Sequence, residues 1–217
     1  MGTHELVAES FERDIGVIIN ENLKPHQQCQ KAANAGMGVL NQILRAFSYR
    51  DRQTYVNLYK TYVRPHLEFA SPAWNPWATC DIEKLEKVQI KFVKQITCLQ
   101  ASTYSDKIKD IGLTTLEARR TKTDLIETFK IIQGYNKVDR KIWFELNCDT
   151  ERRSTRSTNK PNNIVKNRSN MDVRKNFFSQ RVVDPWNSLP EEIQNAKSVA
   201  QFKHLYDEHI KQVQLHE

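Results

Sequence analysis

Basic side chains are the residues of this chain whose types and spacing best support a chemical role. Four lysines recur at intervals of three and four residues, at Lys84, Lys87, Lys91 and Lys94. In a helix this spacing places them along one side, next to an apolar stripe that begins at Leu85. A row of ammonium groups suits the phosphates of a nucleic-acid backbone. The alternative is a solvated lysine face, supported by an ion pair between Glu83 and Lys87.

Three more bases, Arg119, Arg120 and Lys122, lie near the start of another predicted helix. The positive end of the helix dipole disfavours cations at this position. The arrangement therefore needs a compensating negative charge, which is either a bound anion or an acidic neighbour in the fold. We include these three residues among the expected phosphate contacts.

Positive charge is most concentrated between residues 149 and 182, which hold nine bases and three acids. This segment accounts for nearly all of the formal net charge of +7. Concentrated charge indicates a polyanionic partner more strongly than charge that is spread evenly. The alternative is a merely solvated linker. The bases of this segment that we expect to bind a backbone are Arg152, Arg153, Arg156, Arg174, Lys175 and Arg181.

Other chemistry has little support in the sequence. The four cysteines are far apart and form neither a C-x-x-C pair nor a zinc-ribbon pattern, so reduced thiols are expected. The six histidines form no H-E-x-x-H motif or ligand cluster, and neither a nucleophile elbow nor a phosphate loop is present. We therefore expect no catalytic residue, no metal site and no cofactor.

The composition describes a globular, rather polar chain. It has 217 residues, which suffice for one sizeable domain or two small ones, and 39% of them are hydrophobic and 27% charged. The N-terminal residues 1–13 lack the apolar run of a signal peptide, and no run of 18 apolar residues occurs. We expect an intracellular protein, in the nucleus or cytoplasm, that has no membrane partner.

The elements that must position these residues are mostly helices. Residues 15–19 (IGVII) predict a short strand followed by a turn. We expect its partner strands to belong to a region further upstream, the alternative being that it packs as an irregular N-terminal arm. Downstream, apolar spacings of three and four predict helices over 24–47, from 51 to a break at Pro65, and over 81–99, 105–111, 115–134, 172–184 and 198–210. Gly36 and Gly38 should weaken the first helix, and Pro185 should end the helix that begins at 172. The expected fold is mainly α, an irregular multi-helix bundle with one short N-terminal strand and a long basic loop.

Four segments, taken in order, carry a family resemblance. They are residues 14–23 (DIGVIINENL), 62–74 (YVRPHLEFASPAW), 84–92 (KLEKVQIKF) and 173–193 (VRKNFFSQRVVDPWNSLPEEI). Their order and spacing resemble the region after the palm in reverse transcriptases of non-LTR (LINE-like, jockey-type) retrotransposons. The resemblance extends over most of the chain, from about residue 14 to 210.

The resemblance implies how the chain is organised. Residues 1–13 would be an N-terminal tail, and 14–148 a helical domain like the polymerase thumb, which tracks the template–primer duplex. Residues 149–171 would be a basic linker and 172–217 a C-terminal helical extension. The expected partners are RNA, DNA or an RNA–DNA duplex, and possibly the upstream polymerase region of the parent protein.

Departures from the family argue against catalysis. The family polymerase holds two magnesium ions with a paired-aspartate motif, and no Asp-Asp dipeptide occurs here. Any magnesium would belong to the missing palm. Pro185, Gly36 and Gly38 suggest drift from the family pattern. We therefore expect a non-catalytic, nucleic-acid-binding C-terminal fragment of a reverse transcriptase. The alternatives are a helical protein-interaction module and an inert relic of a transposable element.

Overall fold

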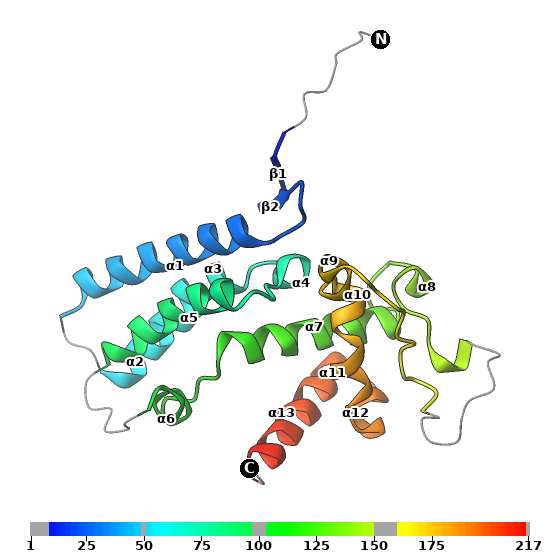
Figure 1. The fold of residues 1–217 in the computed structure, drawn as a ribbon. Coiled ribbons are helices and arrows are strands. Elements are labelled where there is room, and N and C mark those ends of the chain that lie inside the picture. Colours follow the sequence, from blue (N-terminus) through cyan, green and yellow to red (C-terminus); the bar gives the residue numbers. More distant parts are fainter. Residues whose placement is uncertain (1–8, 49–50, 97–102, 150–159, 216–217) are drawn as a thin grey trace. The chain divides into compact units, whose positions relative to one another are not determined.

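The computed structural model describes residues 9–48, 51–96, 103–149 and 160–215 of the chain (Figure 1). They form a mainly α structure with a small antiparallel sheet, which confirms the predicted fold class. The chain divides into two compact units, Met1–Arg120 and Thr121–Glu217. This division falls within a helix and differs from the boundaries expected around residues 149–171. Among the described residues, no helix is both long and apolar enough to cross a membrane.

A β-hairpin begins the described chain. Strand β1 (Phe11–Asp14) pairs antiparallel with β2 (Val17–Asn20), with Phe11 opposite Asn20. Both turn residues have positive φ, 44° at Ile15 and 88° at Gly16, as the tight turn of a two-residue hairpin requires. The strand predicted over 15–19 is present as β2, but the expectation that its partners belong to a region further upstream is wrong. Its partner is the segment just before it, most of which was expected to belong to an N-terminal tail.

Unit 1 is built from helices around an apolar core. Helix α1 packs against α5 and α3, and the rings of Tyr59 and Phe92 stack at 4.3 Å between centroids (Figure 1). The helical elements are α1 (His26–Ala46), α2 (Arg52–Leu58), the π-helical turn η1 (Tyr59–Val63), α3 (Arg64–Glu68), α4 (Ser71–Trp74), α5 (Thr79–Lys94) and α6 (Tyr104–Asp110).

The predicted break at Pro65 takes the form of a π-helical turn. The N–H of Arg64 bonds to the carbonyl of Tyr59, five residues back, and the helix then continues to Glu68. Proline has no N–H and its ring crowds the carbonyl four residues earlier, so a widened turn accommodates it. Asp51 caps α2, accepting a 2.9 Å hydrogen bond from the N–H of Thr54.

A buried polar network connects α5 with its neighbours. The hydroxyl of Tyr59 donates to Gln89 Oε1 at 2.7 Å, and Gln89 Nε2 donates to the hydroxyl of Tyr104 at 2.9 Å. Tyr104 donates to Glu86, whose second oxygen accepts the backbone N–H of Leu116 at 3.0 Å. Burial, together with the charge of Glu86, raises the pKa of Tyr59 well above its usual value. Each side chain of this network has a hydrogen-bond partner, and the network joins η1, α5, α6 and the start of α7.

The two glycines of α1 have different environments. A Cβ on Gly36 would lie 2.8 Å from Cδ2 of the fully buried Leu67, whereas a Cβ on Gly38 would meet nothing within 4 Å. Gly36 therefore allows α1 and α3 to approach closely. This gives Gly36 a packing role in place of the drift inferred from the sequence, and only Gly38 is a simple weakness of the helix.

Alanine at these two positions should have opposite effects. We expect Gly38→Ala to raise the free energy of unfolding by about 0.5–1 kcal/mol, because alanine restricts the unfolded chain and favours helix. We expect Gly36→Ala to lower it by about 1–3 kcal/mol, because the methyl group displaces Leu67 in a packed core. Urea unfolding followed by circular dichroism measures both. Equal effects of the two substitutions would contradict the packing role of Gly36.

Unit 2 begins inside α7 (Leu116–Ile132) and has its own aromatic core. Phe202 stacks on Phe129 at 4.6 Å and on Trp186 at 6.1 Å between ring centroids. The other helical elements are α8 (Arg140–Trp143), the 3₁₀ turn η2 (Asn147–Asp149), α9 (Asp172–Lys175), α10 (Phe178–Arg181), α11 (Val183–Asn187), α12 (Glu191–Gln194) and α13 (Val199–Leu215).

The segment from 172 to 184 is not one helix, and this prediction is wrong. It forms α9, α10 and the start of α11, with an extended residue at Phe177. Pro185 occupies the third position of α11 and does not end it. A first-turn residue has no intrahelical partner for its N–H, so proline costs little there. Pro185 was predicted to end a helix because the helix that begins at 172 was expected to continue to residue 184.

The described part of the expected linker is joined to unit 2. Residues 160–171 are mostly irregular, but Ile164 is buried and forms an isolated β-bridge with Leu146. The N–H of Ile164 donates to Asn187 Oδ1 at 2.8 Å, and the indole N–H of Trp186 donates to the carbonyl of Asn162 at 2.9 Å. This stretch is therefore a packed part of the unit and does not act as a spacer.

Candidate nucleic-acid interface

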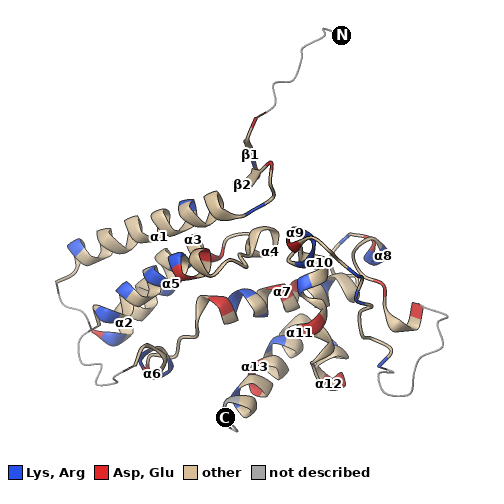
Figure 2. Cartoon of the chain, in the orientation of Figure 1, with Lys and Arg blue, Asp and Glu red and all other residues tan. Residues whose placement is uncertain are grey.

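The four predicted lysines of α5 differ in their availability. Lys84 lies 3.3 Å from the carboxylate of Asp81, and Lys91 donates to Asn41 Oδ1 at 2.8 Å. Lys87 and Lys94 are exposed. Figure 2 marks the basic residues along this helix. Two of the four ammonium groups thus contact their own fold, and the row presents fewer cations to a partner than the spacing predicts.

The bases at the start of α7 have protein partners. Arg119 forms a two-bond ion pair with Glu68 of α3, the second bond being 3.0 Å, and Lys122 pairs with Asp207 of α13. Arg120 is 1% exposed and donates from Nε to Asn75 Oδ1 at 3.1 Å. The acidic neighbours are the compensation that the helix dipole requires. Arg120 is therefore enclosed by the fold, and Arg119 and Lys122 form ion pairs within it.

The expected bases of the basic segment fall into three groups. Arg152, Arg153 and Arg156 lie outside the described residues. Arg181 forms a largely buried ion pair with Asp124 of α7, with bonds of 2.8 and 3.0 Å, and donates to the carbonyl of Asn176. This ion pair holds α10 against α7, so the guanidinium of Arg181 has a partner within the fold at a position where the sequence predicts a phosphate contact.

The remaining two bases lie on α9 and are exposed. Arg174 lies over the ring of Phe177, 5.4 Å from its centroid, which fixes the direction of the guanidinium without neutralising it. Lys175 lies 3.3 Å from the exposed carboxylate of Asp172, a weak pairing in water. Both side chains thus remain able to contact an anion.

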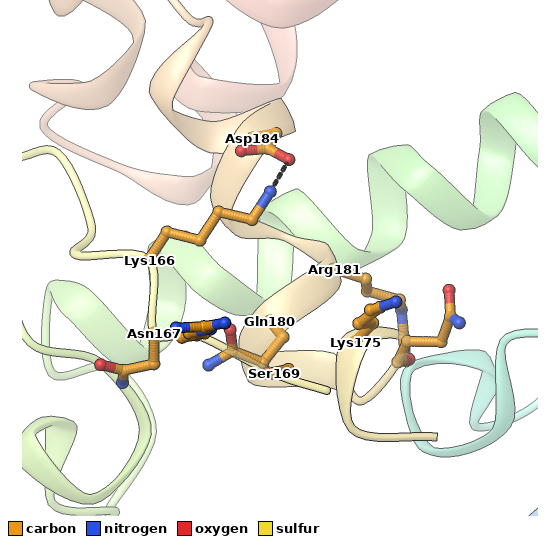
Figure 3. Close-up of a pocket in the computed structure, with 9 residues that line it drawn as sticks. Lys166, Asn167, Ser169, Lys175, Gln180, Arg181 and Asp184 are labelled. Atoms are coloured by element: carbon orange, nitrogen blue, oxygen red, sulfur yellow. Dashed lines mark hydrogen bonds and ion pairs between the residues drawn. The ribbon is translucent and has the colours of Figure 1, made fainter. Parts of the chain in front are cut away.

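A pocket of about 600 Å³ brings the basic segment together within unit 2 (Figure 3). Three stretches form it: the irregular chain at 166–169, α9 with the residue after it, and α10 with the start of α11. In Figure 3 Lys166 extends to Asp184, and Lys175 and Arg181 lie together on the other side of the residues drawn. Its lining residues are Lys166, Asn167, Arg168, Ser169, Lys175, Asn176, Gln180, Arg181 and Asp184.

The lining carries four cations and one acid. Asp184 pairs with Lys166, and Arg181 is committed to Asp124. Arg168 is exposed, and among the described residues it forms no ion pair with an acidic side chain. The hydroxyl of Ser169 is buried and has no hydrogen-bond partner. Guanidinium, ammonium and hydroxyl donors facing one hollow form a suitable environment for phosphate oxygens.

Several residues of this pocket were not among the predicted phosphate contacts. Lys166 and Arg168 contribute to the charge of the basic segment but were not among the expected contacts. Ser169 and Gln180 belong to no motif that predicts a binding role. Arg168 lies four residues before Asp172, the first residue of α9, in a stretch without periodicity. Arg168 and Lys175 line the same pocket because of how the intervening chain folds, which no local sequence pattern predicts.

The structure also brings together a group that the sequence analysis missed in unit 1. His26, Cys80 and Asp81 offer donor atoms that all lie within 4.8 Å of one another. The histidine is distant in sequence from the other two, so spacing rules for metal sites could not detect the group.

Comparisons with known proteins add no assignment. No protein-family model matches the chain, and neither a curated protein nor a solved structure shows a significant similarity to it.

Proposed function

We propose that this chain is a non-catalytic, nucleic-acid-binding segment of a retrotransposon reverse transcriptase, and that its C-terminal unit binds the phosphate backbone through the basic pocket. The observation that carries the proposal is that Lys166, Arg168 and Lys175 line one pocket together with Ser169, whose buried hydroxyl has no hydrogen-bond partner. The resemblance of the four segments to the post-palm region supports the same conclusion. The proposed partners are RNA, DNA or their hybrid duplex, in the nucleus or cytoplasm.

The pocket favours backbone over base recognition. Its available groups are charged donors on irregular chain and on a single helical turn, and these match phosphate oxygens on any sequence. A long helix that could enter a major groove is not among the pocket elements. We therefore expect binding that is independent of sequence and falls steeply with salt.

A salt titration with matched variants tests the proposal. Binding of the full chain to a labelled RNA–DNA duplex is measured by fluorescence anisotropy at several salt concentrations. We expect the double variant Arg168→Ala/Lys175→Ala to bind more weakly and to lower the slope of log affinity against log salt by about 2, one unit for each lost phosphate contact. Both side chains are exposed, so the fold should tolerate the changes.

The control removes the same charge elsewhere in unit 2. Lys203→Ala/Lys211→Ala takes two exposed lysines from α13 and leaves the pocket intact. We expect this variant to keep most of the affinity. Equal losses in the two double variants would show that net charge, and no particular site, governs binding, and this would overturn the pocket assignment. The absence of binding at low salt would overturn the function itself.

A helical protein-interaction module is the second candidate, and one observation favours it. The hairpin and the residues after it expose large apolar side chains, namely Phe11, Ile15, Ile19 and Leu23. Ile15 is 87% exposed, and a two-stranded hairpin alone is only marginally stable in water. A protein that co-purifies with the chain after nuclease treatment would favour this candidate over nucleic-acid binding.

A further inference from the structure

Three different metal-ligand types meet at one edge of unit 1. His26 is the first residue of α1, and Cys80 and Asp81 are the second and third residues of α5. Their imidazole nitrogen, thiol sulfur and carboxylate oxygen all lie within 4.8 Å of one another. His26 Nδ1 and Asp81 Oδ1 are 2.8 Å apart, a hydrogen-bond separation. A metal ion between these two atoms would replace the proton that they share.

The packing of the unit determines this arrangement. Helices α1 and α5 pack against each other through buried residues such as Leu40 and Val88, which holds their N-terminal ends side by side. The backbone of each ligand is therefore set by the core and not by a loose loop. The donors of a tetrahedral zinc site, at bond lengths of about 2.0–2.3 Å, lie roughly 3.5 Å from one another. Rotation of the exposed His26 and Cys80 side chains can bring the donors to this separation, which widens the 2.8 Å between His26 Nδ1 and Asp81 Oδ1.

Access and burial also suit an ion. The Asp81 side chain is 5% exposed, whereas that of His26 is 59% exposed and Cys80 lies at the surface. An ion can thus enter from solvent and reach a carboxylate that is otherwise enclosed. A buried carboxylate is costly without a charged or hydrogen-bonding partner, and here its partners are His26 and Lys84.

The donor set selects the class of ion. Magnesium and calcium take oxygen ligands, whereas imidazole with thiolate is the combination that zinc and neighbouring transition metals bind. Cys29, one turn along α1, is fully buried and is not part of the group. Three protein ligands leave a fourth position for water.

We propose that His26, Cys80 and Asp81 form a three-ligand site for Zn²⁺ or a similar borderline-soft divalent ion, and that the ion joins the N-terminal ends of α1 and α5. Lys84, 3.3 Å from Asp81, and the positive ends of the two helix dipoles oppose the ion. The affinity is therefore lower than that of a site with four thiolate or imidazole ligands.

Cobalt titration tests the site directly. The full chain is freed of metal with a chelator and titrated with Co²⁺, whose absorption reports a thiolate ligand, and Zn²⁺ is then added in competition. We expect one Co²⁺ per chain, a thiolate-to-cobalt absorption band, and displacement of the cobalt by zinc. In Cys80→Ser the thiolate band is lost, and in His26→Gln the affinity falls by about tenfold or more.

The cysteine at position 148 provides the matched control. It is exposed like Cys80 but lies in unit 2, outside the group. Cys148→Ser should bind cobalt as the original chain does, with an unchanged band. The helix content of each variant is checked by circular dichroism, and exposed positions should tolerate these changes. A thiolate band that is missing in the original chain, or that persists in Cys80→Ser, would overturn the proposal. Nucleic-acid binding is measured separately, so failure of one proposal does not decide the other.

Discussion

Replacement of Trp186 by alanine should lower the free energy of unfolding of unit 2 by about 3–5 kcal/mol. Trp186 is 0% exposed, stacks on Phe202, and donates its indole N–H to the carbonyl of Asn162. The substitution leaves a large cavity between α11 and α13 and frees a carbonyl of the packed segment at 160–166. Because the whole stability of a domain is about 5–15 kcal/mol, this loss should leave the unit partly unfolded at 37 °C.

Urea unfolding followed by far-ultraviolet circular dichroism measures the effect. The matched control is Trp186→Phe, which keeps an aromatic ring but has no N–H donor. We expect it to cost less than alanine, about 1–3 kcal/mol, because the carbonyl of Asn162 loses its partner while most of the packing remains. If alanine cost no more than phenylalanine at this position, the ring would not be a core residue of the unit.

Loss of Arg181 should have an effect of similar size. Arg181→Met keeps much of the side-chain volume but leaves the carboxylate of Asp124, which is 5% exposed, without its guanidinium partner. Removing one member of a buried ion pair costs about 3–5 kcal/mol, because the remaining charge stays desolvated and loses its guanidinium counter-charge. The same unfolding experiment gives the value.

A double variant separates the charge effect from packing. Arg181→Met/Asp124→Leu removes both charges, and we expect it to recover much of the stability that Arg181→Met loses. Lys175→Ala is the control for a neighbouring exposed base, and it should change the stability by less than about 0.5 kcal/mol. If the double variant were less stable than Arg181→Met alone, the pair would contribute specific bonds that apolar contacts do not replace.

These two side chains show why the segment from 172 to 193 needs careful interpretation. Its sequence contains both basic and aromatic residues. All of its bases were expected to contact phosphate. In the structure Arg181 and Trp186 hold the unit together, whereas Arg174 and Lys175 remain exposed. Nucleic-acid binding measured on an Arg181 variant would therefore report unfolding as well as contact, so the exposed bases are the appropriate test positions.

Helices and their starts were largely predictable from the sequence. The first helix was expected over 24–47 and spans His26–Ala46, and Ser198 caps the last helix, accepting from the N–H of Gln201 at 3.1 Å. These features depend on apolar spacing and on side chains within a few residues, so local sequence is sufficient. The same local logic failed between 172 and 184, where tertiary packing breaks one periodic stretch into three short helices.

Local sequence could not predict which bases form ion pairs within the fold and which remain exposed. Arg119 and Lys122 occur close together in one helix, but their acidic partners, Glu68 and Asp207, lie far away in the chain. The proximity of His26 to Cys80 and Asp81 likewise follows from the packing of α1 on α5.

The sequence by itself determined the mainly helical architecture, the caps and the concentration of positive charge before residue 182. Only the tertiary structure decided which cations are paired inside the fold, which face a pocket, and which distant donors meet. The physical reason is range: helical periodicity is set by neighbours within a few residues, whereas charge pairing and ligand geometry depend on segments that folding brings together.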